Sequence, residues 1–316
     1  MDNLTHGLTG ALMGQTGLKK KTGLGMAALI LGANLPDIDV VGLLWLDEQE
    51  ALGFRRGITH GPIGVALLPI GLAALLWGFD RWQGSRGKRP EARDPVSFKW
   101  LYILGLIGAI SHSLMDWFNN YGVRFLYPFD RDWYYGDTLF IIDIYLWAIL
   151  GLSIWWSART NKSGGNGAAK AWIGIAIACV YAFMNWGITV YNETNKGTLS
   201  EPYPSFVIGN PQPGQFWRRE RIIQLQDGRW YSVDWEGPEL GYGYKALDLT
   251  LCKMPEDPAL QSTQAQGFMT WSRAPIATRA ADGSVILYDA RFMAAVVRER
   301  FKLALPNVEC EELEAE

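Results

Sequence analysis

The only three histidines of the chain lie, like several of its aspartates, at the borders of apolar stretches. Imidazole and carboxylate groups together are the usual ligands of zinc and related divalent ions. His112 and Asp116 are four residues apart, so a helix would place both side chains on one face, where they could hold one cation. These residue types predict a metal site, provided that the fold brings the dispersed side chains together.

The candidate ligands outnumber those that one zinc ion needs. They are His6, Asp37, Asp39, His60, His112 and Asp116. This surplus favours more than one ion, with an aspartate bridging two metals that hold the attacking and leaving oxygens of a phosphoester. We expect a general base, or a group supporting the ligands, at Asp39 or Asp143.

Positive side chains accompany the candidate ligands. Arg55 and Arg56 directly precede the segment of His60, and Arg124 lies in a following loop. Each could neutralise a phosphate, or equally well contact lipid headgroups. Thr5 and Thr59 each precede a histidine and could form a hydrogen bond with it.

The elements that must position these residues are apolar helices. Five runs have about the 20 residues that a hydrocarbon core of about 30 Å requires: 23–46, 59–79, 100–118, 138–157 and 171–190. The shorter run Leu4–Leu18 lacks the basic region of a cleaved signal peptide and predicts a sixth helix. Its glycines share one face, which favours close packing against another helix; they are Gly7, Gly10, Gly14 and Gly17.

Basic residues predict the orientation of these helices. If Leu4–Leu18 runs inward, the cytoplasmic segments 19–22, 80–99 and 158–170 carry twelve Lys and Arg, and the opposite segments carry four. All the candidate ligands, together with Asp2, Asp137 and Asp143, then lie in the outer half of the membrane. A proton or ion pathway, the main competing explanation, or a transporter would need polar residues in the inner half as well, where almost none are found.

Residues 1–190 therefore form a predicted transmembrane helical domain, and residues 191–316 a predicted extracytoplasmic β-rich domain. Short alternating runs in the second part are typical of antiparallel strands; they are Arg221–Leu225, Trp230–Trp235, Ala246–Leu251 and Val285–Tyr288. We expect a helix over Arg291–Leu305. Cys252 and Cys310 could form a disulfide.

Several other functions find no support in the composition and motifs. The net charge of −3 and the lack of a basic stripe argue against nucleic-acid binding. The chain has no Gly-x-Ser-x-Gly elbow, no phosphate-binding Gly-x-x-x-x-Gly-Lys loop and no Cys-x-x-Cys pair. Metal chemistry is thus the strongest catalytic hypothesis.

The ordered motifs of the first 150 residues resemble the YdjM-like (DUF457) family of bacterial membrane proteins, described as metal-dependent hydrolases. The matching elements are Asp2-x-x-Thr5-His6, Leu35-Pro36-Asp37-Ile38-Asp39, Arg56-Gly57-x-Thr59-His60, His112-x-x-x-Asp116 and Gly136-Asp137-x-x-Phe140-Ile141-Ile142-Asp143. Two later motifs resemble the extension of long-tailed members: Trp271-Ser272-Arg273-x-Pro275 and Asp289-x-Arg291-Phe292.

The resemblance implies a bacterial inner-membrane location and a distant similarity to zinc-dependent phospholipase C and P1 nuclease, which hold three zinc ions. It implies metal-ligand roles for His6, Asp37, His60, His112 and Asp116. Arg55 stands where the family often has histidine, and Gly61 where serine is usual. With only three histidines, one or two ions are expected.

The sequence thus predicts a multi-pass membrane hydrolase that uses a divalent metal, with zinc as the leading candidate. The expected substrate is an ester or phosphoester, lipid-like or otherwise amphiphilic, which enters from the bilayer. Arg55 or Arg56 would contact its anionic group. The alternative is a binding or regulatory membrane protein with a structural metal and a C-terminal domain that recruits a partner.

Overall fold

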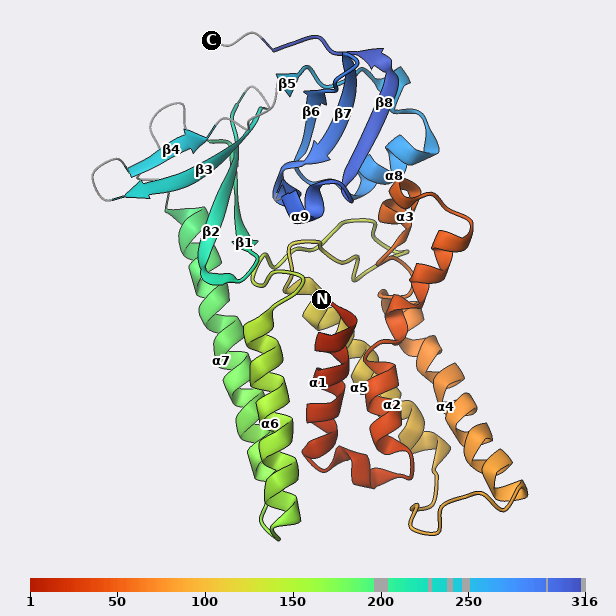
Figure 1. The fold of residues 1–316 in the computed structure, drawn as a ribbon. Coiled ribbons are helices and arrows are strands. Elements are labelled where there is room, and N and C mark those ends of the chain that lie inside the picture. The colour runs from red at the N-terminus through yellow and green to blue at the C-terminus, as the bar shows by residue number, and fades with distance from the viewer. Residues whose placement is uncertain (196–203, 227–228, 238–240, 246–250, 294, 314–316) are drawn as a thin grey trace. The chain divides into compact units, whose positions relative to one another are not determined.

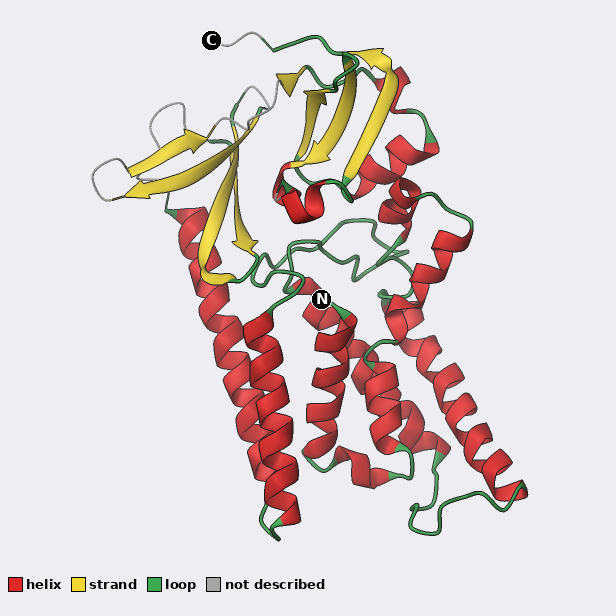
Figure 2. Cartoon of the chain, in the orientation of Figure 1, coloured by secondary structure: helices red, strands yellow, loops and turns green. Residues whose placement is uncertain are grey.

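The computed structural model describes residues 1–195, 204–226, 229–237, 241–245, 251–293 and 295–313. A helical region is followed by a region rich in β-sheet (Figure 2). The chain divides into two compact units that interleave in sequence. The first, helical unit contains residues 1–39, 56–187 and 213–216, and the second unit contains 40–55, 188–212 and 217–316.

The helices of the first unit alternate in direction along the chain (Figure 1). They are α1 (Asn3–Gln15), α2 (Gly25–Gly32), α4 (Pro62–Ser85), α5 (Phe98–Trp117), α6 (Ile144–Lys162) and α7 (Gly167–Thr194), with the 3-10 helices Leu18–Lys21 and Leu35–Leu44. The last residues of α7 and of Leu35–Leu44 already belong to the second unit. Asp2 N donates to Ile141 O, which brings the starts of α1 and α6 together. The end of α5 lies there too, because His6 Nε2 is 3.3 Å from Asp116 Oδ1.

Glycines allow α1, α2 and α5 to approach closely. A Cβ atom at Gly10 would lie 2.7 Å from Leu29 O, and one at Gly32 would lie 2.5 Å from Gly105 O. The predicted close packing of α1 is therefore confirmed at Gly10, and Gly14 packs against Met26 in the same way. Gly17 differs, since it ends the helix with a φ of 110°.

Three described helices, α4, α5 and α7, are long and apolar enough to cross a membrane. The predicted span over 23–46 is broken: α2 and the 3-10 helix Leu35–Leu44 pass the same test only together, with a bend of 51°. Pro36 lies just after this break and has no N–H for a helical hydrogen bond. The predicted span over 138–157 begins late, because Asp143 caps α6 by accepting from Leu146 N, and α6 is not among the three.

The second unit contains two antiparallel four-stranded sheets. One has the order β1-β2-β3-β4 and the other β5-β6-β7-β8. The strands are β1 (Phe206–Gln212), β2 (Gln215–Gln224), β3 (Trp230–Gly237), β4 (Gly241–Lys245), β5 (Leu251–Cys252), β6 (Pro275–Arg279), β7 (Ser284–Asp289) and β8 (Lys302–Glu309). Helices α3 (Glu48–Phe54) and α8 (Thr263–Trp271) pack against each other in the same unit.

The predictions for the tail have mixed outcomes. Strands are found at Arg221–Leu225, Trp230–Trp235 and Val285–Tyr288, whereas most of Ala246–Leu251 lies outside the described residues. The predicted helix over Arg291–Leu305 is wrong. The described residues of this stretch form a 3-10 turn and the short α9 (Ala295–Arg298), and β8 follows because Leu303 and Leu305 become buried when they pair with β7.

Two features fix the second sheet. Cys252 and Cys310 form a disulfide. Asp289 is buried and accepts hydrogen bonds from Ser272 Oγ and from Arg291, at 2.7 and 2.8 Å. Burial alone raises the pKa of the Asp289 carboxyl, but the Arg291 guanidinium and the donated hydrogen bonds outweigh it and hold the pKa below its ordinary value of 3.8.

Candidate metal centre

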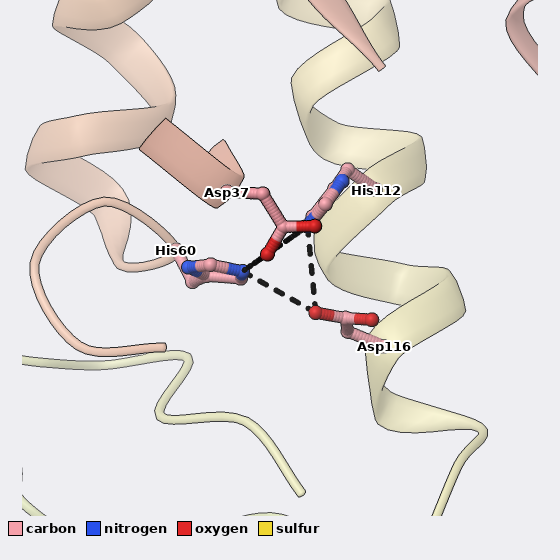
Figure 3. Close-up of side chains that lie close together, drawn as sticks. All are labelled: Asp37, His60, His112 and Asp116. Atoms are coloured by element: carbon pink, nitrogen blue, oxygen red, sulfur yellow. Dashed lines mark hydrogen bonds and ion pairs between the residues drawn. The ribbon is translucent and has the colours of Figure 1, made fainter. Parts of the chain in front are cut away.

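Four side chains converge at the end of the helical unit where α4 begins and α5 ends (Figure 3). They are Asp37, His60, His112 and Asp116, whose ligand atoms all lie within 4.8 Å of one another. Asp37 follows the break after α2, His60 stands in the turn before α4, and the other two are one helical turn apart on α5. Within the described ranges this is the only such group of three or more side chains of metal-ligand type.

The separations between the ligand atoms suit a small cation. Nε2 of His60 and Nε2 of His112 are 3.1 Å apart, and they lie 3.3 and 3.4 Å from Asp116 Oδ2. Asp37 Oδ1 is 3.9 Å from each of these nitrogens. In a tetrahedron with metal–ligand bonds of about 2.0–2.1 Å, neighbouring ligand atoms are about 3.3–3.4 Å apart. For tetrahedral coordination, Asp37 would have to move closer to the other three ligand atoms.

Contacts outside the group orient both imidazole rings. Nδ1 of His112 lies 2.7 Å from Ala33 O, and Nδ1 of His60 lies 3.0 Å from Thr59 Oγ1. A carbonyl oxygen only accepts hydrogen bonds, so His112 carries a proton on Nδ1 and, when neutral, presents the Nε2 lone pair to the group. A histidine that binds a metal is typically held in this way through its other nitrogen.

Polar atoms without hydrogen bonds also favour a cation-binding site. Asp116 Oδ2 is buried with no hydrogen-bond partner, although Arg56 Nε approaches to 3.1 Å. Both ring nitrogens of the buried His6 likewise have none. Burying such groups unsatisfied is costly, and a bound cation would satisfy them. The donor set therefore fits a divalent metal.

His6 lies beside the four ligands rather than among them. Its ring stacks on that of His112 with centroids 3.7 Å apart, and its Nε2 is 3.3 Å from Asp116 Oδ1. Asp116 thus directs Oδ1 towards His6, where it also accepts hydrogen bonds from the Met1 ammonium and the Asn119 amide, and directs Oδ2 towards His60 and His112. This is the arrangement of a carboxylate that could bridge two positions.

Asp39 contacts the ring nitrogen of His60 that faces away from the other candidate ligands. Its Oδ2 is 3.6 Å from His60 Nδ1 and accepts hydrogen bonds from Arg56 N and Thr59 Oγ1, at 2.8 and 3.4 Å. Thr59 is therefore near its histidine, as expected. Thr5 is not hydrogen-bonded to His6; its hydroxyl contacts Asp2 and Trp147 instead.

The other predicted site residues have different surroundings. Arg56 donates to Asn119 Oδ1 and Gly122 O as well as pairing with Asp116, so its guanidinium is occupied by the protein rather than open to a substrate anion. Arg124 stacks on the rings of Tyr127 and Trp133, at 4.6 and 4.9 Å.

Two more candidates lie outside the group of four. Asp143 is hydrogen-bonded to Leu146 N and to Tyr181 Oη, which places it at the start of α6. Arg55 ends α3 and belongs to the second unit.

Asn119 is a site residue that the sequence reasoning missed. Its amide donates to Asp116 Oδ1 at 3.4 Å, and its carbonyl oxygen accepts from Arg56 and from Tyr121 N. It therefore links the carboxylate, the arginine and the turn that follows α5. The signal in the sequence was Asn119-Asn120-Tyr121-Gly122, a turn pattern directly after the His112–Asp116 helix.

The apolar helices and the buried His/Asp group together define a membrane protein with a candidate metal centre. The chain belongs to the YdjM inner membrane protein family, whose family model matches residues 1–192. It is also 28% identical over 136 residues to the uncharacterized protein YfhP of Bacillus subtilis (strain 168).

The alignment with YfhP covers 42% of this chain and 37% of YfhP, so the chain spans little more than a third of that relative's length. No solved structure matches the chain. The similarity to zinc-dependent phospholipase C and P1 nuclease therefore stays a prediction.

Proposed function

We propose that this protein is a metal-dependent hydrolase of the inner membrane that cleaves an ester or phosphoester in a lipid-like substrate. The observation that carries the proposal is the convergence of Asp37, His60, His112 and Asp116, with their inward nitrogens and oxygens within 4.8 Å of one another. Family membership and the apolar helices support the membrane location. Zinc is the expected ion, because imidazole and carboxylate ligands suit it.

Asp37, His60, His112 and Asp116 would hold a divalent cation, which would supply Lewis acidity to lower the pKa of water and polarise an ester oxygen. Neighbouring residues orient the candidate ligands for this chemistry. Ala33 O and Thr59 hold the two imidazole rings with Nε2 facing inward. Asp39, which contacts the outer side of His60, supports the orientation and basicity of that ring, and we assign it this role in preference to that of general base.

His6 and Asp116 extend the proposal to a second ion. Asp116 Oδ1 faces His6 and its Oδ2 faces His60. The ring nitrogens of His6 make no hydrogen bond. Two ions in one site would hold both the attacking and the leaving oxygens of a phosphoester. We therefore expect one or two bound ions.

We propose that the metal centre and the C-terminal unit both lie on the extracytoplasmic side. The basic segments 19–22, 80–99 and 158–170 connect helices at the end opposite the centre, as the positive-inside rule requires of cytoplasmic loops. The disulfide between Cys252 and Cys310 supports the same orientation, because disulfides persist outside the cytosol.

Metal analysis of detergent-purified protein tests the site. We expect the wild type to contain one or two zinc ions per chain and a His112→Ala/Asp116→Ala variant to contain almost none. Asp94→Ala is the matched control, because Asp94 is exposed and lies in a loop at the other end of the helices. Unchanged metal content in the double variant would refute the site.

Activity distinguishes the enzyme from a second candidate. Four protein ligands equal the number in a closed structural zinc site, which favours a binding or regulatory protein whose metal only stabilises the fold. A hydrolase should release nitrophenol from a 4-nitrophenyl ester or phosphodiester, and the double variant should not. A protein that loses its stability with its metal, yet never shows turnover, would support the structural alternative.

A further inference from the structure

Residues 40–55 belong to the second unit, although they lie between candidate ligands of the first. The chain leaves the helical unit after Asp39 and returns to it at Arg56. Asp37 precedes this excursion by three residues, and His60 follows it by five. Two of the four candidate ligands therefore lie on the short stems, residues 36–39 and 56–60, that flank a segment of the second unit, which is called the C-terminal unit below.

Helix α3 in this excursion is held tightly by α8. The two helices meet at Gly53 and Gly267, where neither position has room for a side chain. A Cβ atom at Gly53 would lie 2.8 Å from Gly267 Cα, and one at Gly267 would lie 2.5 Å from Gln49 O. Because backbone meets backbone here, any larger residue must push the helices apart.

Side chains add to this contact. Gln49 Nε2 donates to Lys302 O at 3.1 Å, which ties α3 to β8. Gln264 Nε2 donates to Asp47 Oδ2 at 2.7 Å, directly before α3 begins. Ala51 and Leu52 are both buried. Helix α3 is thus a packed element of the second unit, whereas most of residues 40–46 before it are exposed.

The two stems of the excursion are joined beside the candidate metal centre. Asp39 Oδ2 accepts from Arg56 N at 2.8 Å, so the residues on either side of the excursion are tied to each other. The same carboxylate contacts Thr59 and His60. A displacement of α3 acts on both stems, and hence on Asp37 and His60 together.

We infer that the C-terminal unit controls the geometry of the metal centre through the α3–α8 contact, with Gly53 and Gly267 as positioning residues. This inference rests on the proposed metal-dependent function and adds a means of regulation to it. A shift of α3 on α8 would then move Asp37 and His60 relative to His112 and Asp116 on α5. The C-terminal unit is then a part of the site's control.

Zinc affinity of the full-length protein tests this inference. The metal-free wild type and a Gly267→Val variant are titrated with Zn²⁺ in detergent against a competing chelator. We expect the variant to bind Zn²⁺ about tenfold more weakly or worse, as is typical when residues that support ligands are changed. Gly267→Ala should lie between the two, because a smaller side chain forces a smaller displacement.

Controls separate positioning from general damage. Thr270→Val introduces the same side chain at an exposed position of α8 and should leave affinity unchanged. Gly53→Ala should resemble Gly267→Ala, and the double variant should lose less affinity than the sum of the two, since one displacement already opens the contact. Hydrogen exchange at 36–39 and 56–60 should rise in Gly267→Val, whereas the Cys252–Cys310 disulfide stays formed.

Each other outcome is decisive. Equal Zn²⁺ affinity in a folded Gly267→Val variant overturns the inference but leaves the proposed metal site intact. If the wild type itself binds no metal, the proposed function fails, and hydrogen exchange on the two stems alone decides whether α3 is coupled to them. If Gly267→Val does not fold, a Gln49→Ala/Gln264→Ala variant replaces it, with unchanged affinity counting against the inference.

Discussion

Asp116 in the helical unit and Asp289 in the β-rich unit are both buried carboxylates beside an arginine, yet their surroundings differ in kind. Asp289 accepts hydrogen bonds at both oxygens, from Ser272, the backbone of 273–274 and Arg291. Asp116 faces three histidines; its Oδ1 accepts hydrogen bonds from the Met1 ammonium and Asn119, whereas its Oδ2 makes no hydrogen bond.

The difference shows that burial of a charge does not by itself indicate a functional site. A buried carboxylate whose oxygens are all satisfied by donors completes a structural network. One that has an oxygen without a hydrogen bond among histidine nitrogens is suited to binding a cation. The motifs singled out in the two units thus have different surroundings: those of the first bring candidate ligands together, and Asp289 in the second ties two strands and a loop together.

The largest effect should follow from removing the arginine of the buried Asp289–Arg291 ion pair. Arg291→Ala leaves Asp289 buried without its main counter-charge, so we expect the free energy of unfolding of the C-terminal unit to fall by about 3–5 kcal/mol. Urea unfolding followed by tryptophan fluorescence measures this. Arg279→Ala, which removes an exposed pair with Glu312, is the control and should change stability by less than about 1 kcal/mol. Similar effects of the two variants would contradict the structural role.

A smaller effect is expected at Asp39, which contacts His60 of the candidate metal centre. Asp39→Asn keeps the shape of the side chain but removes the charge beside His60, so zinc affinity should fall by about 10–100-fold with little loss of stability. Chelator competition measures the affinity, and thermal unfolding of the metal-free protein measures the stability. A stability loss as large as that of Arg291→Ala, with affinity unchanged, would assign Asp39 to the fold instead of the metal.

The smallest effect concerns pH. Because the pKa of Asp289 is lower in the folded unit than its ordinary value of 3.8, its charged form stabilises the fold above that value, and this contribution is lost as pH falls through the lower folded pKa. We expect wild-type stability to fall more between pH 4 and pH 2 than that of Asp289→Asn, by at most about 1.4 kcal/mol per pH unit. Parallel pH curves for the two proteins would contradict this.

The sequence predicted which candidate ligands lie close together better than it predicted the residues that contact them. Lys and Arg counts alone placed Asp37, His60 and His112 at one end of the helices, since alternating helices fix which ends meet. The spacing of His112 and Asp116 predicted their shared face. The role of Arg56 could not be predicted, because its partners Asn119 and Gly122 lie more than 60 residues away and are reached only after folding.

The β-rich unit was less predictable for a similar reason. The stretch Arg291–Leu305 has the composition of a helix, but Leu303 and Leu305 gain burial by pairing with Leu287 and Val285 of β7. Local preference thus yields to a partner strand elsewhere in the chain. The packing of α3 into this unit also escaped prediction, because residues 40–55 look like the end of one span and a loop.

The excursion of residues 40–55 has a consequence for how such a chain can be divided. A fragment that begins after α7 would lack α3, and so would leave the face of α8 around Gly267 uncovered. Conversely, a fragment that ends before residue 195 would contain α3 without α8. Its residues 40–55, which lie between the candidate ligands Asp37 and His60, would then have no partner helix. The two halves cannot be exchanged as modules between relatives unless residues 40–55 are exchanged with the tail, so inheritance of the tail and of this early segment should go together.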